Sequence, residues 1–256
     1  MLSWSARRKF LYTAVAAVIV LALLTWADVY FFSKPVTCFD NLQNNGETGV
    51  DCGGPCARLC TADVHAPIVA WARSFETATS TYTAAAYIQN PNTGAAAYGV
   101  HYAFRLFDSN NILVVERDGV IDLPPQPTVP IIEPNIIAGN RAVAHAFLEF
   151  SGDITWTKVP QTVLPSVHIT NQQLSPDGSQ LSATVVNDGN TTVHGLTVAA
   201  VLFDASDNAE EASKSAVPDI PAGVSEQVVF TWPTSSVPIV RAELTPIPAL
   251  PPLQTP

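Results

Sequence analysis

The stretch VHYAFRLFD, residues 100–108, decides the fold of this 256-residue chain. Every second residue in it is apolar and bulky: Val100, Tyr102, Phe104 and Leu106. The turn-forming residues 108–111 follow, with the sequence DSNN. Alternation with a period of two, ended by turn formers, is typical of a strand with one buried face.

Similar segments lie on both sides of this stretch. Tyr82, Ala84, Ala86 and Ile88 alternate in the same way before the turn at residues 90–94. Many short strands separated by turns predict an all-β chain built from Ig-like β-sandwiches. Further strands are expected at Ile112–Val115, Val129–Ile132, Ala142–Phe150 and Ile154–Val159.

The pattern then recurs at an offset of about 96 residues, which predicts a duplicated domain. Ile88–Thr93 corresponds to Val185–Thr191, and Leu106–Ser109 corresponds to Leu202–Ala205. Leu123-Pro124 likewise corresponds to Ile220-Pro221. We therefore expect two tandem Ig-like sandwiches, at residues 64–160 and 161–245, followed by a proline-rich tail at residues 246–256 that is extended or disordered.

An apolar run near the N-terminus predicts a membrane helix. Arg7-Arg8-Lys9 precedes Phe10–Ala27, which would rise roughly 27 Å as a helix, close to the thickness of a bilayer core. The positive-inside rule predicts cytoplasmic residues 1–9, a transmembrane signal anchor at 10–32 and extracytoplasmic domains beyond it. A cleaved signal peptide is the alternative, but Thr25-Trp26-Ala27 is a poor cleavage site.

The charge balance excludes one class of partner. Without the three N-terminal cations, nine of the 12 Lys and Arg residues remain against 22 Asp and Glu, a net charge of −13. Such an acidic surface repels nucleic acid. The expected partners are the membrane, through residues 10–32, and an unknown protein or surface partner.

Four cysteines fall within the juxtamembrane segment, residues 33–63: Cys38, Cys52, Cys56 and Cys60. An even number of cysteines in a short, loop-rich exported segment predicts two disulfides, in any of three pairings. A zinc site of four thiolates is the alternative. The spacing lacks the paired C-x2-C knuckles of zinc ribbons, so disulfides are favoured.

The same segment is rich in oxygen ligands that suit calcium, with Asp40, Asn44, Glu47 and Asp51 as weak candidates. An EF-hand loop counted from Asp40 would need glycine at position 6 and glutamate at position 12, and the chain has neither there. A solvated polar turn held by disulfides is therefore favoured, and no cofactor or metal is expected.

Two short motifs resemble known families. CFDNLQNNGETGVDCGGPC, residues 38–56, resembles the cysteine motif C-x-D-G-x-x-N-x-x-E-T-x-V-D-C-G-G-x-C of surface-exposed bacterial proteins, with Asn41 where that family usually has Gly. FRLFD, residues 104–108, resembles the F-x-L-Y-D signature of a bacterial Ig-like domain. The second repeat is similar to that family and to CARDB domains, related to bacterial cell adhesion, although Ala200 replaces the first Phe. These resemblances imply a bacterial cell-surface protein with binding or spacer modules and no catalytic residues.

The search for catalytic chemistry gives weak candidates. The five histidines occur in no metal-binding spacing, and His101, His145 and His194 are expected on strands. Asp108 and Asp204 end equivalent strands, where Asp normally caps a turn. The sequence predicts a membrane-anchored extracytoplasmic binding, adhesion or scaffold protein that is not an enzyme. An accessory subunit of a cell-envelope or secretion assembly is the alternative function.

Overall fold

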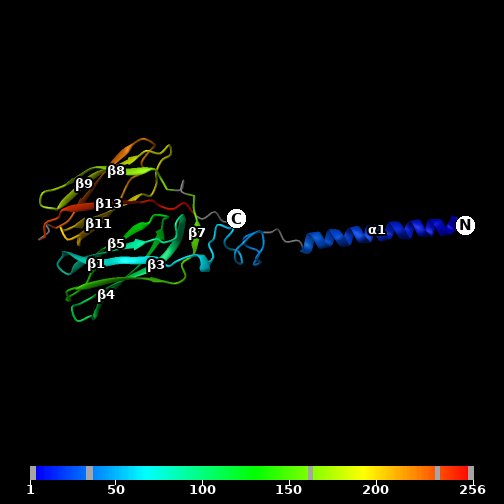
Figure 1. Cartoon of the computed structure of the whole chain (residues 1–256), viewed down its shortest axis with the longest axis horizontal. Helices are drawn as coiled ribbons and strands as arrows, with labels where there is room; N and C mark the ends of the chain where they lie inside the picture. The colour runs from blue at the N-terminus through cyan, green and yellow to red at the C-terminus, as the bar shows by residue number, and fades with distance from the viewer. Residues whose placement is uncertain (1–3, 33–36, 161–163, 234–236, 253–256) are drawn as a thin grey trace. The chain divides into compact units, whose positions relative to one another are not determined.

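A computed structural model describes residues 4–32, 37–160, 164–233 and 237–252. Its single long helix, α1, spans Trp4–Phe32 (Figure 1). Within it, Arg7–Tyr30 is long and apolar enough to cross a membrane, and none of that stretch is buried against protein. The helix begins six residues before the predicted start, because Arg and Lys are good helix formers and Arg8 stacks on the ring of Trp4 at 3.7 Å.

Beyond this helix, the regular structure of the described chain is antiparallel β-structure apart from one short 3-10 helix, which confirms the predicted fold class. The first sandwich contains β1 (Ile68–Ala78), β2 (Thr81–Gln89), β3 (Ala95–Phe107), β4 (Leu113–Leu123), β5 (Thr128–Ile137), β6 (His145–Ser151) and β7 (Trp156–Lys158). The second contains β8 (Val167–Leu174), β9 (Gln180–Asn187), β10 (Thr197–Phe203), β11 (Ala209–Ala216), β12 (Ser225–Thr231) and β13 (Arg241–Ile247). A short 3-10 helix, Thr61–Asp63, precedes β1.

Both sandwiches share one topology. Sheets β1-β2-β5 and β4-β3-β6 form the first sandwich, with β7 added to β3. Sheets β8-β9-β12 and β11-β10-β13 repeat that order in the second. The predicted equivalences bury alike, since Ile88, Leu106, Val185 and Leu202 are all fully buried in the two cores.

The duplicated turns also share a set of side-chain hydrogen bonds, and Asn187 Nδ2 makes one more, to the carbonyl oxygen of Ile220. Asn90 and Asn187 each donate through Nδ2 to carbonyl oxygens of the following turn and of a proline, Pro124 or Pro221. Each also accepts a bond at Oδ1 from the backbone N–H two residues later. The same asparagine thus closes the same turn in both sandwiches, which the Asn repeat in the sequence predicted.

Asp108 and Asp204 cap equivalent turns, as predicted. The Oδ1 of Asp108 accepts bonds from the backbone N–H groups of Asn110 and Ile112, both at 2.9 Å. Asp204 accepts the corresponding bonds from Ser206 and Asn208, both at 2.8 Å. Both carboxylates therefore serve as structural acceptors.

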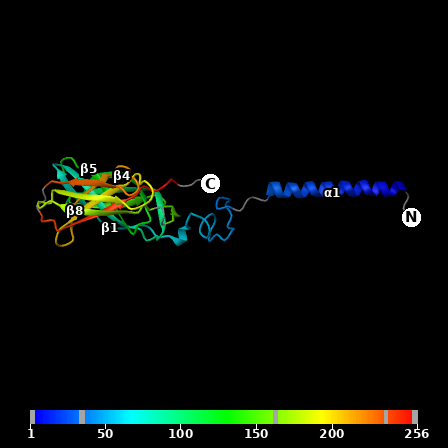
Figure 2. The same ribbon diagram turned by 90° about the horizontal axis from the view of Figure 1, so that it is seen from above.

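The two sandwiches pack on each other through a third apolar cluster. Sheet β1-β2-β5 contributes Phe75, Ala85, Tyr87 and Ile132, and sheet β11-β10-β13 contributes Ala199, Val201, Phe203, Ala209 and Ala212. Strands β2 and β10 are therefore buried on both faces. The four sheets form successive layers in Figure 1 and overlie one another when seen from above in Figure 2.

Some predicted boundaries differ from the structure. β4 continues eight residues beyond Val115, because the charges that broke the apolar pattern, Glu116 to Asp118, lie on an exposed edge strand. β13 extends to Ile247 and so includes the first residues of the predicted tail. Pro246 is tolerated there because β13 is an edge strand. Strands β1, β8, β11, β12 and β13 were not predicted individually.

Truncating Leu106 or Leu202 to Ala should destabilise the protein by about 2–5 kcal/mol in each case, because both side chains are fully buried. Urea unfolding followed by far-UV circular dichroism measures the change. Val120→Ala is the matched control, since Val120 is 58% exposed on β4 and its truncation should cost less than about 0.5 kcal/mol. Equal effects at Leu106 and Val120 would contradict the assigned core.

Candidate functional site

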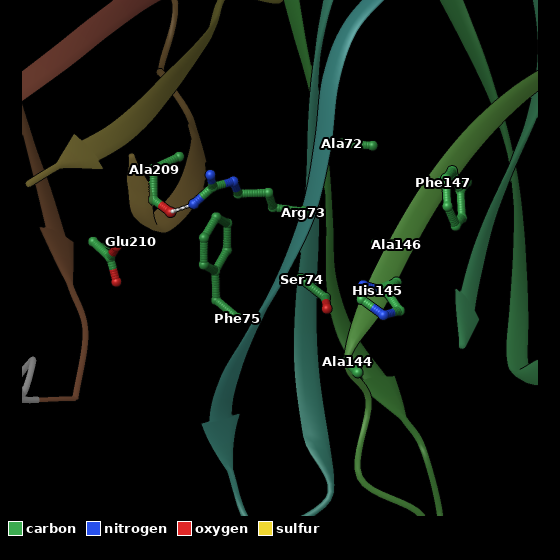
Figure 3. A pocket seen from close by; sticks show the side chains of 10 residues that line it. All are labelled: Ala72, Arg73, Ser74, Phe75, Ala144, His145, Ala146, Phe147, Ala209 and Glu210. Atoms are coloured by element: carbon green, nitrogen blue, oxygen red, sulfur yellow. Dashed lines mark hydrogen bonds between the residues drawn. The ribbon is translucent and has the colours of Figure 1, made fainter. Parts of the chain in front are cut away.

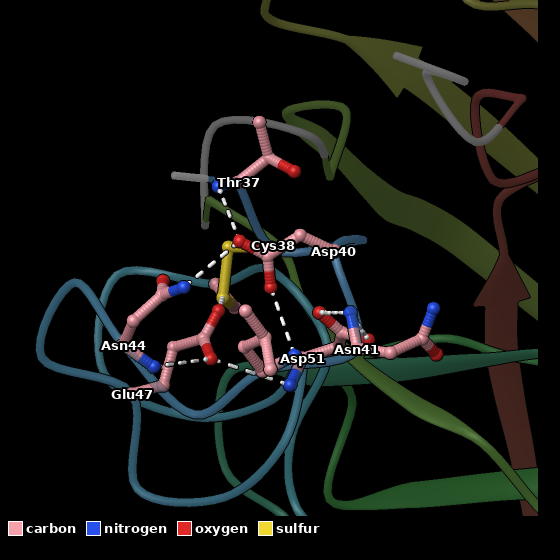
Figure 4. Close-up of a disulfide and its surroundings, with 9 residues drawn as sticks. Thr37, Cys38, Asp40, Asn41, Asn44, Glu47 and Asp51 are labelled. Carbon is pink, nitrogen blue, oxygen red and sulfur yellow. Dashed lines mark hydrogen bonds between the residues drawn. A yellow bond between two sulfur atoms is a disulfide. The ribbon is translucent and has the colours of Figure 1, made fainter. Parts of the chain in front are cut away.

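The cysteine-rich segment, residues 37–60, contains the four cysteines and the calcium candidates that the sequence singled out. Cys38 and Cys56 form a disulfide with a Cα–Cα separation of 5.7 Å (Figure 4). Cys52 and Cys60 are also disulfide-bonded, and no cysteine is free. This agrees with the predicted pair of disulfides and leaves no thiolate for the four-cysteine zinc site.

Left-handed backbone conformations produce the turns of this segment. Asn41, Asn45 and Asp51 have φ values of 61°, 50° and 52°, a region that Asn and Asp enter more readily than other residues with a side chain. Asn41 takes this conformation at a position where glycine, which has no Cβ, would also be favoured.

Gly54 is required by close packing as well as by its φ of +51°. A Cβ atom built on Gly54 would lie 2.1 Å from the carbonyl oxygen of Gly46, which is backbone and cannot rotate away. Gly46 also has a positive φ, of +79°, but its Cβ direction is open. Both glycines have a left-handed backbone, but only Gly54 lacks space for a Cβ atom.

Glu47 is a buried carboxylate beside the disulfide, with 7% of its surface exposed. Its Oε2 accepts bonds from the backbone N–H groups of Asn44 and Asp51, at 3.2 and 3.3 Å. Its Oε1 lies 3.1 Å from Cys56 Sγ. Glu47 thus ties the two sides of the loop together around the Cys38–Cys56 bond (Figure 4).

The calcium candidates lie in this segment as acceptors of backbone and amide bonds. Asp40 accepts from the N–H of Leu42 at 2.9 Å and from Asn44 Nδ2 at 2.8 Å. Asp51 accepts from the N–H of Asn41 through both oxygens. Both carboxylates therefore serve as hydrogen-bond acceptors within the turns of the segment.

In the described part of the chain, one trio of potential ligand atoms lies within 4.8 Å: those of Cys38, Glu47 and Cys56. Two of these atoms are the bonded sulfurs of the disulfide, which leaves a single carboxylate as a hard ligand. Calcium binding by Asp40, Asn44, Glu47 and Asp51 stays the disfavoured alternative to the predicted polar turn.

A groove of about 470 Å³ lies where edges of the first sandwich meet the second. Its walls are stretches of β1 and β6 with Ala209 and Glu210 of β11 (Figure 3). Arg73 is already engaged there, donating to the carbonyl oxygen of Ala209 at 3.2 Å and to Asn208 Oδ1 at 2.9 Å. Small and large residues line the groove in equal number, and the guanidinium of Arg73 serves the contact between the sandwiches.

The histidines occupy separate places in the fold. His101 lies on β3 and His145 begins β6, as predicted, whereas His194 lies in the connection between β9 and β10 and not on a strand. His194 Nδ1 lies 2.7 Å from Asp219, and His168 pairs with Asp188. Both pairs are exposed, where such contacts contribute little to stability.

Glu211 is a titratable group that the sequence analysis missed. It pairs with Leu202 across β10 and β11, so its side chain lies on the core face of the second sandwich. It is 8% exposed, and its Oε2 has no hydrogen-bond partner in the described part of the chain. Burial, and then the charge of Glu210, raise the pKa of Glu211 from 4.5 to about 7.

No family model matches this chain, and no curated protein matches its sequence. The resemblances to the bacterial Ig-like and CARDB domains and to the cysteine motif therefore remain predictions. The sequence offered no signal for Glu211, because an acidic residue in AEEASKSA is typical of an exposed strand. Only the pairing of β11 with β10 places that side chain inside.

We expect Gly54→Ala to disrupt the cysteine-rich segment, because its new methyl group would overlap the Gly46 carbonyl oxygen. Gly46→Ala is the matched control and should cost only the roughly 1–2 kcal/mol of a left-handed alanine. Alkylation without reductant, followed by mass spectrometry, counts free thiols in each variant. Free thiols in Gly54→Ala but not in Gly46→Ala are expected, and equal results would contradict the close contact.

Stability should fall as pH rises from about 4.5 to 7, because folded Glu211 holds its proton in that window and the unfolded residue does not. Glu211→Gln should remove that part of the pH dependence and stabilise the protein at pH 8 by roughly 1–2 kcal/mol, after allowance for solvent screening. Urea unfolding across this range measures it. Glu210→Gln is the control and should keep most of the slope, because burial is the larger cause of the raised pKa of Glu211. An unchanged slope in Glu211→Gln would contradict the assignment.

Proposed function

We propose that this chain is a membrane-anchored extracytoplasmic binding, adhesion or scaffold protein without catalytic activity. The observation that carries the proposal is the exposure of α1. Large apolar side chains cover it on all sides, including Val15, Val18, Leu21 and Leu24, each more than half exposed. A helix that is apolar all round needs an apolar environment, and the sandwiches are built from sheets that bury their own cores.

The proposed orientation rests on charge and on sulfur chemistry. Arg7, Arg8 and Lys9 open the helix, and cations of this kind favour the cytoplasmic side. The disulfides after the helix suit an oxidising compartment. Both features support placing residues from 33 onward outside the cytoplasm.

The proposal of binding without catalysis rests on how the polar groups are used. Asp108 and Asp204 cap turns, Glu47 ties a loop together, and Arg73 joins the two sandwiches. These groups serve the architecture. Display of two sandwiches that share an apolar contact suits a binding or scaffold role.

Protease added to intact spheroplasts should degrade the sandwiches and leave a fragment that contains α1. The physical reason is that the cations before the helix hold the N-terminus inside. Immunoblotting with tags at the two ends measures the outcome. A cytoplasmic protein serves as the control for intact membranes, and full protection of the C-terminal tag would contradict the orientation.

Purification of the full chain in mild detergent separates the two kinds of role. A lone protein is expected for a display or adhesion module. A stoichiometric partner recovered from the same membranes would favour the accessory subunit of an envelope or secretion assembly. Turnover of ester, peptide or glycoside substrates by the purified chain would contradict the absence of catalysis.

A further inference from the structure

The contact between the two sandwiches joins faces that are not equivalent. Sheet β1-β2-β5 of the first sandwich packs on sheet β11-β10-β13 of the second, and the latter is the counterpart of β4-β3-β6. A head-to-tail contact of this kind can repeat without closing. The outer faces of β4-β3-β6 and β8-β9-β12 are the two surfaces through which a second copy of the chain would continue the stack.

The outer face of β4-β3-β6 differs from its docked counterpart by charge. With Leu106 aligned to Leu202, Arg105 stands in the place of Val201. Its neighbours across the sheet, Glu116 and Asp118, take the places of Ala212 and Lys214. Arg105 Nε lies 2.6 Å from Glu116, so an ion pair occupies the position that is apolar in the contact.

Asp118 reverses the charge found at the equivalent Lys214, so the outer face lacks the counterpart of an ion pair that joins the sandwiches. Lys214 Nζ lies 3.6 Å from Glu133 Oε1, which belongs to β5 of the first sandwich. Glu133 also accepts a bond from Tyr102 at 2.7 Å and is itself largely buried. The carboxylate of Asp118, at the Lys214 position, cannot donate to an acceptor such as Glu133, and burying it without a donor costs several kcal/mol.

The outer face of β8-β9-β12 differs from its counterpart by the loss of aromatic rings. In the docked face, Trp71 and Tyr87 stack with their ring centroids 4.8 Å apart. Thr170 and Thr184 pair at the equivalent place in the second sandwich. Ser182 likewise takes the place of Ala85, so hydroxyl groups replace the apolar surface of the contact.

We infer that each outer face corresponds to one of the two faces that pack together between the sandwiches. Polar residues on the outer faces prevent a second copy of the chain from extending the stack. Charged residues prevent docking on β4-β3-β6, and the loss of apolar area prevents docking on β8-β9-β12. The duplicated fold supplies the geometry for a polymer, and the side chains limit it to two sandwiches.

Two variants of the full chain in detergent micelles test this, each restoring one face to its docked counterpart. The first carries four changes on β4-β3-β6 and the second carries three on β8-β9-β12. Each alone should remain monomeric, because its restored face has no partner, and an equimolar mixture should give about twice the monomer mass in detergent-corrected sedimentation. The changes are Arg105→Val, Glu116→Ala, Asp118→Lys and Glu149→Thr in the first, and Thr170→Trp, Ser182→Ala and Thr184→Tyr in the second.

A matched control adds Ala103→Asp to the first variant, which returns a charge to the centre of the restored face and should abolish the complex. Self-association of either variant alone would show a different mode of contact and overturn the inference. So would a mixture of folded variants that stays monomeric, or a wild-type chain that already self-associates through these faces.

The changes all lie on outer sheet faces, and cooperative thermal unfolding verifies that each variant folds. A reduced pair, Arg105→Val with Glu149→Thr mixed with Ser182→Ala and Thr184→Tyr, replaces any variant that does not fold. The reduced pair should show weaker association than the full pair, and its complete absence in folded protein would also contradict the inference.

Discussion

The packing of sheet β1-β2-β5 on sheet β11-β10-β13 is the contact on which the double sandwich depends. Small side chains make it possible, because Ala85 on β2 and Ala199 on β10 let two sheets approach while Tyr87 and Phe203 fill the space beside them. Each strand must also face its own core through its other side. Because β2 and β10 are each buried on both faces, each of their sheets must pack against a second sheet on either side. The four sheets therefore form one stack. Their apolar surface would otherwise be a large exposed patch, of a kind that promotes association.

Much of this fold could be predicted from the sequence, because a period of two is a direct record of which side of a strand is buried. Residues 100–106 and their copy near Leu202 gave the strands, the duplication and the matching turns at Asn90 and Asn187. The edge strands were missed or cut short for the same reason. An edge strand such as β4 carries outward charges that interrupt the pattern, and protecting an exposed edge with charge is a general device.

The cysteine-rich segment shows a different limit. Composition and spacing were enough to predict disulfides and tight turns, since six of its residues with φ above zero are Asn, Asp or Gly: Asn41, Asn45, Gly46, Asp51, Gly53 and Gly54. They were not enough to choose a pairing, because chain separation permits all three. The role of Glu47 was also hidden, since burial of a carboxylate depends on which backbone N–H groups the folded loop turns toward it.

The shared cluster between the sandwiches has a consequence for how the protein can change over generations. A chain that lost one repeat would keep a complete core in the other, yet it would expose either Tyr87 and Ile132 or Val201 and Phe203 to water. The two copies have thus become mutually dependent, although each retains the topology of an autonomous domain. Deletion of a repeat would therefore destabilise the remaining one, and substitutions are tolerated best on the outer faces and loops.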